Sequence, residues 1–369
     1  MKIQRVALIS PYALSVYGGV QEQVLAMSRV LSARGREVLI VAPDASDVTD
    51  YDTPARLVRL GPRSSFPANG SKAPLTISPI AAWRAKQAVE AFNPDVVHFH
   101  EPFAPLLGWS LLHRHQHPSV GTFHRSGSGP ALRLTKPLLE RLATRLDVAV
   151  SVSKAAARTI EDACGLKSDV LFNGFEMERF VATPRQRSSE TVLFYVGRLE
   201  QRKSVATAVE AAHHHNARSE RPWLLVIAGD GPERARLQSL AARSQRIVFI
   251  GPISDEEKRA WLRRADALIA PSTRGESFGL VLLEGMASET LVVASDIEGY
   301  RAAGGEFATI FTPGNVSSLE GAIIRALEGE SDKKIAAARQ HAERWSMNAL
   351  MDEYEERYAR AQKIFQATK

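Results

Sequence analysis

"TVLFYVGRLEQRKSVATAVEAAH", residues 191–213, contains the pattern that decides the fold class. Its first six residues are aliphatic, aromatic or β-branched, which predicts a strand buried on both faces of a parallel sheet. Gly197 then permits a turn, and from Ser204 to His213 the apolar residues recur at helical spacing. A buried strand that leads through a turn into a helix is one half of a βαβ unit.

The same alternation recurs along all 369 residues, which is longer than one hydrophobic core usually serves. The sequence predicts strands at Arg5–Ile9, Val38–Ala42, Asp95–His98, Pro118–Phe123, Val148–Val152, Val192–Val196, Trp223–Ala228, Ile247–Ile250, Ala267–Ala270 and Leu291–Ala294. It predicts helices at Gln21–Arg34, Ile80–Phe92, Pro137–Leu146, Ser204–His213 and Asp255–Arg264. So many short strands suit two doubly wound, Rossmann-like α/β domains better than one.

The boundary between the two domains is expected in a polar, turn-rich stretch, "LFNGFEMERFVATPRQRSSE" (residues 171–190). We therefore predict a first domain over residues 1–173 and a second over residues 174–345. The final stretch, Trp345–Phe365, is again amphipathic. We expect the segment 346–369 to form a helix that packs back on the first domain.

Composition and charge limit the possible functions. The single cysteine, Cys164, excludes an intrachain disulfide and fits a reducing compartment. No apolar run approaches the length of about 18 residues that spans a bilayer, and the start of the chain reads as a strand rather than a signal peptide. The net charge of +6 favours anionic partners. Because the Lys and Arg residues are scattered, nucleic acid is not expected among these partners.

Several motifs follow predicted strands. Gly18-Gly19 precedes a predicted helix, where free N–H groups could bind an anion or simply form a β-to-α turn. His124 comes at a strand end that faces the ligand crevice of such sheets, although a lone histidine is often structural. Arg198 and Lys203 leave one strand end together and could grip a diphosphate or be solvated loop residues.

Other motifs have a stronger structural explanation. The GDGPE sequence at residues 229–233 is accounted for by turn chemistry. Ser254 and Glu257 form a predicted capping box, which leaves Asp255 and Lys258 exposed where they could read a base. In "GESFGLVLLEGMA" (residues 275–287), two glutamates flank apolar residues, and a buried carboxylate is costly unless it is paired.

Together these motifs resemble the retaining glycosyltransferases of family 4. The resemblance rests on GR-x₄-K at Arg198 and Lys203, on GDGPE, and on E-x₇-E at Glu276 and Glu284. It implies the GT-B fold, in which two Rossmann-like domains face each other across a cleft. "GGVQEQV", "HFHEPFAP", "GTFHRS", "NGS" at Asn69–Ser71 and "GESFGLVLLEGMA" further resemble the phosphatidylinositol mannosyltransferases of actinobacteria.

The resemblance implies a role for each matching residue. Glu276 would hold sugar hydroxyls and Glu284 the ribose, while Arg198 and Lys203 would neutralise the leaving diphosphate. His124 would lie near the reacting centre. The implied catalytic residues are His124, Glu276, Arg198 and Lys203. The implied donor-binding residues are Gly19, Arg198, Lys203, Ile253, Asp255, Lys258, Glu276, Ser277, Phe278, Gly279, Leu280 and Glu284. The implied acceptor-binding residues are Tyr12, Gln21, Asn69, Gly70, Ser71, Lys72 and His124.

The predicted activity is the retaining transfer of mannose from GDP-mannose to a phosphatidylinositol-type lipid. The enzyme would be cytoplasmic and peripheral at the anionic inner face of the cell membrane. No metal site or cofactor is predicted, although Mg²⁺ bound with the nucleotide is compatible with the sequence. Two alternatives remain open: a UDP-sugar donor or another acceptor, and a non-catalytic protein that binds a nucleotide sugar.

Overall fold

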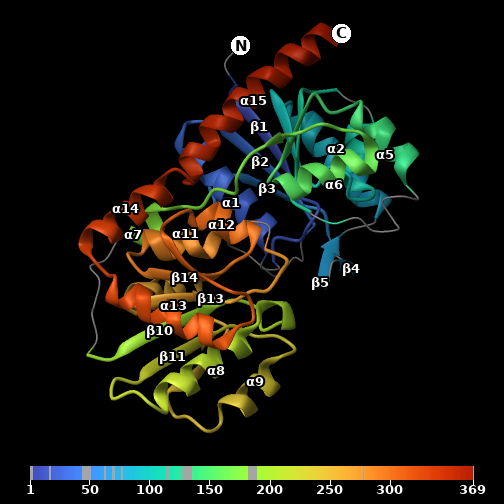
Figure 1. The fold of residues 1–369 in the computed structure, drawn as a ribbon. Helices are drawn as coiled ribbons and strands as arrows, with labels where there is room; N and C mark the ends of the chain where they lie inside the picture. Colours follow the sequence, from blue (N-terminus) through green and yellow to red (C-terminus); the bar gives the residue numbers. More distant parts are fainter. Residues whose placement is uncertain are drawn as a thin grey trace. The chain divides into compact units, whose positions relative to one another are not determined.

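The computed structural model describes residues 3–15, 18–43, 51–61, 64–68, 71–75, 78–113, 116–125, 127, 135–181, 189–276 and 278–368. The chain divides into two compact units (Figure 1). The first unit comprises Met1–Gly174 together with Met347–Lys369, and the second unit comprises Phe175–Ser346. The chain therefore leaves the first unit at Gly174 and returns to it for the final helix.

The first unit is built on a seven-stranded sheet in the order β3-β2-β1-β6-β7-β8-β9, in which all neighbours are parallel. Its strands are β1 (Arg5–Ile9), β2 (Glu37–Ala42), β3 (Arg56–Arg59), β6 (Val96–His100), β7 (Ser119–Phe123), β8 (Val148–Ser151) and β9 (Asp169–Val170). A separate antiparallel pair joins β4 (Ser64–Ala68) to β5 (Ser71–Leu75).

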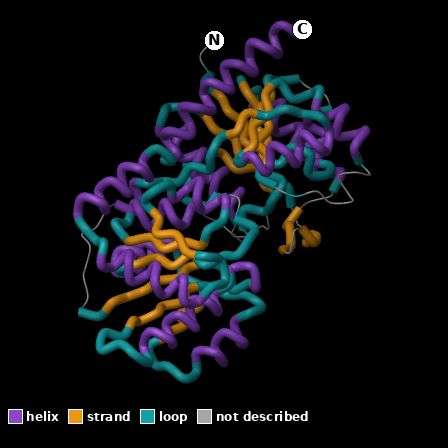
Figure 2. Tube along the Cα trace, in the orientation of Figure 1, coloured by secondary structure: helices purple, strands orange, loops and turns teal. Residues whose placement is uncertain are grey.

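Helices cover both faces of this sheet (Figure 2). The apolar side chains of α1 (Gly19–Ala33) and α15 (Met347–Thr368) fill one face. The other face is covered by α2 (Pro79–Phe92), α3 (Leu107–Leu112), α5 (Lys136–Ala143) and α6 (Lys154–Cys164). Because successive strand residues point to opposite faces, Val96, His98 and His100 of β6 face α15, whereas Val97 and Phe99 face the other core.

The second unit contains a six-stranded parallel sheet in the order β12-β11-β10-β13-β14-β15. Its strands are β10 (Thr191–Val196), β11 (Trp223–Ala228), β12 (Ile247–Gly251), β13 (Ala267–Ala270), β14 (Leu291–Ser295) and β15 (Ala308–Phe311). Its helices are α7 (Glu178–Val181), α8 (Val205–Asn216), α9 (Arg234–Ala241), α10 (Asp255–Arg264), α11 (Leu280–Ala287), α12 (Glu298–Gly304), α13 (Val316–Glu328) and α14 (Asp332–Glu343), with a 3₁₀ turn at Gln201–Lys203.

Each sheet has the doubly wound strand order in which the chain moves outward from a central strand and then crosses to the other side. The crossing points lie between β1 and β6 in the first unit and between β10 and β13 in the second. Ligands of doubly wound sheets bind beyond the carboxyl ends of the strands at such points. The predicted α/β fold class is confirmed, and it directs the search for a site to these two strand ends.

All ten predicted strands occur, most with bounds shifted by one or two residues. The sequence patterns missed β3, β9 and β15, which are short, and the β4–β5 pair. No helix in the described part of the chain has the length and apolar character needed to cross a bilayer.

Candidate functional site

The loop after β10 is shaped by glycines on a neighbouring loop. Gly229 and Gly231, which follow β11, both adopt positive φ angles. A Cβ atom on Gly229 would overlap the carbonyl of Gly197, and one on Gly231 would overlap the backbone of Leu199. The GDGP sequence therefore serves as a tight support for the loop that carries Arg198 and Lys203.

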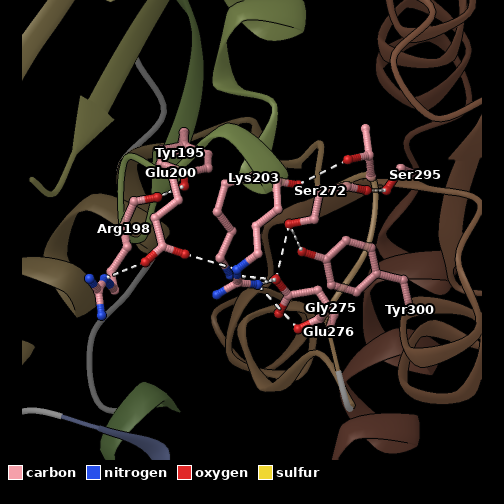
Figure 3. A network of polar contacts seen from close by, with 11 residues as sticks. Tyr195, Arg198, Glu200, Lys203, Ser272, Gly275, Glu276, Ser295 and Tyr300 are labelled. Atoms are coloured by element: carbon pink, nitrogen blue, oxygen red, sulfur yellow. Dashed lines mark hydrogen bonds and ion pairs between the residues drawn. The ribbon is translucent and has the colours of Figure 1, made fainter. Parts of the chain in front are cut away.

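That loop joins the loop after β13 through a chain of ion pairs (Figure 3). Glu200 accepts from Nε of Arg198 at 2.9 Å and from Nε of Arg202 at 2.8 Å. Glu276 Oε1 is 3.1 Å from Nη1 of Arg202 and 2.5 Å from Nζ of Lys203. We call these five residues the ionic cluster. It brings together Arg198, Lys203 and Glu276, three residues singled out from the sequence.

Glu276 is held from several sides. Ser272 donates to its Oε1 at 3.1 Å, and the Ser272 hydroxyl also contacts the Tyr300 hydroxyl at 2.9 Å (Figure 3). Arg202 additionally donates to the carbonyl of Gly275. Burial, and then the nearby Glu276 carboxylate, raise the pKa of Tyr300, so its hydroxyl stays protonated. Within the described residues Oε2 of Glu276 has no hydrogen-bond partner, so this oxygen is available to a ligand.

The inner members of this arrangement were missed by sequence reasoning. Glu200 and Arg202 lie inside the GR-x₄-K motif but were read as spacers, and Ser272 and Tyr300 were not considered. The side chain of Arg198 is 60% exposed, whereas those of Lys203 and Glu276 are 18% and 14% exposed. The alternation of Arg, Glu and Arg at positions 198, 200 and 202 was the signal that could have indicated a charge-paired loop.

The start of α11 follows Glu276 directly. Gly279 adopts a φ of 94°, a conformation that favours glycine, and the helix begins at Leu280. Phe278 is buried and packs edge-on against Trp345 at 4.9 Å between ring centroids. Leu282 donates its N–H to the carbonyl of Gly279 at 2.9 Å, whereas the N–H groups of Leu280 and Val281 precede the first acceptor of the helix and could meet an anion. Ser277 lies outside the described residues.

The structure corrects the prediction for Lys258 and revises that for Glu284. Lys258 was expected to be exposed, but it is buried, and its Nζ lies 3.0 Å from Oε1 of the buried Glu284. Lys258 precedes the buried Leu262 by one helical turn, so both residues lie on the inner face of α10. Asp255, which is half exposed, is 3.4 Å from the same ammonium group.

Burial of Glu284 is thus explained by a buried cation, whereas the resemblance explained this carboxylate by the ribose hydroxyls. Its role at the ribose stays a prediction. The predicted capping box of Ser254 and Glu257 is confirmed. Ile253 lies in the loop just before this cap and is partly exposed.

In the first unit, polar side chains gather at the carboxyl ends of β6 and β7. Nδ1 of His100 lies 3.0 Å from Nε2 of His124, and the two rings stack. His98 also stacks on His100, with ring centroids 4.6 Å apart. We call these three residues the histidine cluster. Burial lowers the pKa of His98 to about 3 and that of His124 to about 4, so their imidazoles are neutral at pH 7.

Glu101 fixes the backbone at the end of β7. Its Oε1 accepts from the backbone N–H groups of His124 at 2.6 Å and Arg125 at 2.7 Å. Burial raises the pKa of Glu101 although these hydrogen bonds oppose the shift. Burial, followed by the nearby Glu101, also raises the pKa of Tyr12, which places Tyr12 close to this group. Glu101 and His100 lie within "HFHEPFAP" but were not singled out as site residues.

The remaining predicted residues of the first unit are placed as follows. Gln21 is buried and donates to the carbonyl of Ala13 at 3.3 Å, so its amide is tied to the loop after β1. Gly19 begins α1 and has open space where a side chain would be. Ser71 and Lys72 lie in β5, and Asn69 and Gly70 fall outside the described residues.

Models of two glycosyltransferase families match the two halves of the chain. The family model of the group 1 glycosyl transferases matches residues 176–349, and that of glycosyltransferase family 4 matches residues 17–179. A phosphatidyl-myo-inositol mannosyltransferase of Mycobacterium leprae is 32% identical over 364 residues, covering 95% of this chain and 96% of the relative. One of Mycobacterium tuberculosis is 34% identical and covers 80% and 79%.

Solved structures share the fold at low sequence identity. A glycosyltransferase from Rickettsia africae superposes with a TM-score of 0.77 at 18% identity, covering 98% of this chain and all of the other. The doubly wound sheets of this chain thus match those of GT-B glycosyltransferases.

Proposed function

This chain belongs to glycosyltransferase family 4, and from that premise we propose that it transfers mannose from GDP-mannose to a phosphatidylinositol-type lipid with retention of configuration. The observation that carries the proposal is the ionic cluster at the carboxyl ends of β10 and β13. The names of the relatives support the mannosyl and inositol-lipid specificity.

The ionic cluster has the chemistry that a nucleotide diphosphate requires. It sets three cations against two carboxylates, so an excess positive charge remains for an anionic ligand. A diphosphate would replace the carboxylates as the partner of Arg198 and Lys203. Each charge-assisted hydrogen bond formed in this way would contribute about 1.5–3 kcal/mol.

In the proposed mechanism, Lys203 and Arg198 stabilise the negative charge that develops on the leaving β-phosphate. The acceptor hydroxyl attacks the anomeric carbon from the side on which the diphosphate leaves, and a phosphate oxygen takes its proton. Glu276, held through Oε1, presents Oε2 to the sugar hydroxyls. No step requires a protein nucleophile, and Mg²⁺ bound with the nucleotide would share the phosphate charge.

Exposed apolar side chains on α2 support attachment to the cytoplasmic face of a membrane. Ile80 is 70% exposed and Trp83 is 62% exposed, one helical turn apart. Tryptophan favours the interface between water and lipid, and Arg84 lies beside it.

We expect the double variant Ile80→Ser/Trp83→Ser to reduce co-sedimentation of the protein with anionic phospholipid vesicles. Ile364→Ser, an exposed position on α15, is the matched control. If both variants bind the vesicles equally, α2 does not contribute to membrane binding.

The experiment that tests the proposal has two stages. Thermal shift with GDP, UDP and ADP at equal concentrations should show the largest stabilisation with GDP. Radiolabelled GDP-mannose should then label phosphatidylinositol, and the anomeric configuration of the product can be read by NMR. Stronger stabilisation by UDP would redirect the proposal to a UDP-sugar. Binding of a nucleotide sugar with neither transfer nor hydrolysis, across acceptors from a membrane lipid extract, would favour a non-catalytic role.

A further inference from the structure

The histidine cluster is connected to the C-terminal helix by a buried hydrogen-bond network. Nδ1 of His98 contacts the hydroxyl of Tyr358 at 2.8 Å, and Nε2 of His98 contacts Oγ1 of Thr122 at 2.7 Å. The Thr122 hydroxyl in turn contacts the Tyr354 hydroxyl at 2.8 Å. Since His98 and both tyrosines are buried, α15 fixes His98 in one position, and His98 stacks on His100.

His100 has one nitrogen in a hydrogen bond and one without. It is 2% exposed, and its Nδ1 contacts Nε2 of His124. Its Nε2 is buried and has no hydrogen-bond partner among the described residues. Burial, followed by the neighbouring His98 and His124, lowers the pKa of His100, so it carries a single N–H proton. That proton lies either on the nitrogen that contacts His124 or on the nitrogen without a partner.

The two arrangements leave different groups unsatisfied. If His124 donated to Nδ1 of His100, the His100 proton would lie on Nε2 as a buried N–H without an acceptor. If His100 donates instead, only a lone pair remains unpaired. Orphaned N–H groups are rarer in protein interiors than under-used acceptors. The second arrangement is therefore favoured, with the proton of His100 on Nδ1.

The tautomer of His100 determines that of His124. When Nε2 of His124 accepts from His100, the single proton of the neutral His124 must lie on Nδ1. His124 is partly exposed, and its ring contacts the described residues by hydrogen bonding through Nε2 and not through Nδ1. We propose that His100 is a positioning residue that fixes His124 as an Nδ1–H hydrogen-bond donor toward an oxygen of the sugar or acceptor.

This proposal rests on the proposed function for the identity of the ligand oxygen, but the tautomer itself does not depend on it. A histidine with its proton on Nδ1 and its Nε2 occupied has no free lone pair with which to remove a proton. His124 is then a donor and cannot be the general base. The proton of the acceptor hydroxyl leaves with the phosphate, as the mechanism above requires.

Long-range ¹H–¹⁵N NMR of the histidine-labelled full chain at pH 7.5 tests the tautomer directly, with the His124 signals assigned by their loss in His124→Gln. The Nδ1–H pattern is expected for His124. An Nε2–H pattern, or averaging between the two tautomers, would overturn the proposal whether or not the protein transfers mannose. Conversely, absence of transfer with an intact Nδ1–H signature would overturn only the proposed function.

Two variants of His100 separate positioning from packing. In His100→Asn the amide nitrogen can replace Nδ1 as donor, so His124 should keep its Nδ1–H signature and turnover should stay within about threefold. In His100→Leu the donor is lost, so the signature should shift toward Nε2–H and kcat should fall about tenfold, about 1.4 kcal/mol, at constant KM for the donor. His117→Asn, at a histidine bonded to the carbonyl of Pro94 outside the cluster, controls for the chemical change. Loss of the signature in His100→Asn, or its retention in a folded His100→Leu, would contradict the proposal.

Discussion

The ionic cluster of the second unit and the histidine cluster of the first unit both lie at the carboxyl ends of central strands in doubly wound sheets. Their chemistry differs. The ionic cluster consists of charged side chains that neutralise one another, and Arg198 at its edge is mostly exposed. The histidine cluster consists of neutral rings held by burial and by hydroxyl groups.

The difference indicates what each cluster can bind. Charges paired with each other can exchange partners when an anion arrives, because the desolvation cost has already been met. Neutral imidazoles cannot balance a diphosphate, but they can direct a hydrogen bond to a hydroxyl oxygen. We therefore propose that the second unit binds the diphosphate and that the first recognises a hydroxyl group. This difference can be tested by lowering the pH, by removing a charged side chain, and by replacing the carboxylate that competes with the diphosphate.

Acid should separate the two clusters most strongly. Folding lowers the pKa values of His98 and His124 to about 3 and about 4, whereas the unfolded histidines take up protons below 6.5. Stability is therefore complete above pH 6.5 and is lost as the pH falls toward 4. At pH 5 each of these two histidines should cost about 2 kcal/mol, about 4 kcal/mol together, and His100, whose pKa is also lowered by burial, adds to this loss. Calorimetric unfolding at pH 7.5 and pH 5 measures this loss.

The control for the acid experiment compares two histidine variants. His98→Gln should lose about 2 kcal/mol less than the wild type between these pH values, whatever its stability at pH 7.5. His113→Gln, at an exposed histidine of the same unit, should follow the wild type. If His98→Gln and the wild type lose the same stability on acidification, the description of the histidine cluster as neutral is wrong.

Removal of one cation from the ionic cluster should impair transfer. Lys203→Ala deletes the ammonium group that lies 2.5 Å from Glu276 and that we assign to the leaving phosphate. Loss of one such group typically lowers turnover about 10²–10³-fold, about 2.7–4 kcal/mol. Steady-state transfer from GDP-mannose measures it, with Lys333→Ala, an exposed lysine of the same unit, as control. If both variants transfer mannose at the same rate, Lys203 does not stabilise the leaving phosphate.

The fold was readable from the sequence because buried parallel strands are continuous apolar runs. Three strands, Arg5–Ile9, Trp223–Ala228 and Ala267–Ala270, have the predicted bounds. Of the four edge strands in the two parallel sheets, only β12 was predicted. The strand β3 (Arg56–Arg59), for example, is partly exposed and begins and ends in arginine, so it lacks the apolar run. A strand with only one neighbouring strand is less buried, so its sequence needs fewer apolar residues and is harder to recognise as a strand.

The site was only partly readable, because its partners are distant in sequence. The contacts of Lys203 with Glu276 and of His98 with Tyr358 join positions 73 and 260 residues apart. Motif spacing indicated Lys203 and Glu276 as residue types but not their pairing in the protein without ligand. Lys258 was expected to be exposed beside the capping box of Ser254 and Glu257, whereas its position one turn before Leu262 indicated the buried face of α10.

Breaking the buried pair in the second unit should reduce stability. Glu284→Gln removes the buried anionic partner of Lys258 and leaves the half-exposed Asp255 beside its ammonium group. Losing one partner of a buried pair costs about 3–5 kcal/mol, and we expect the lower value, about 3 kcal/mol, because Asp255 remains. Urea unfolding measures the change. Lys258→Met/Glu284→Leu should recover most of it, since an apolar pair removes both charges. If the double variant is as unstable as Glu284→Gln, the stability lost in Glu284→Gln does not come from leaving the charge of Lys258 buried without its partner.

The smallest expected effect concerns partner exchange at Glu276. Glu276→Gln keeps an oxygen for Ser272 and Arg202 but releases Lys203 from its carboxylate. If a diphosphate competes with Glu276 for Lys203, GDP affinity should rise roughly two- to fivefold, because pairs that remain partly exposed contribute about 0.5–1 kcal/mol. Transfer should nevertheless fall about tenfold or more, since the carboxylate no longer stabilises the positive charge that develops on the sugar. Calorimetric titration with GDP and transfer assays on the same preparation measure both quantities, with Glu298→Gln, an exposed helix-end glutamate, as the control.

Weaker GDP binding by Glu276→Gln would show that Glu276 orients Lys203 for the phosphate instead of competing with it. The ionic cluster would then be preorganised in the same sense as the histidine cluster, and the contrast between them would be one of charge alone.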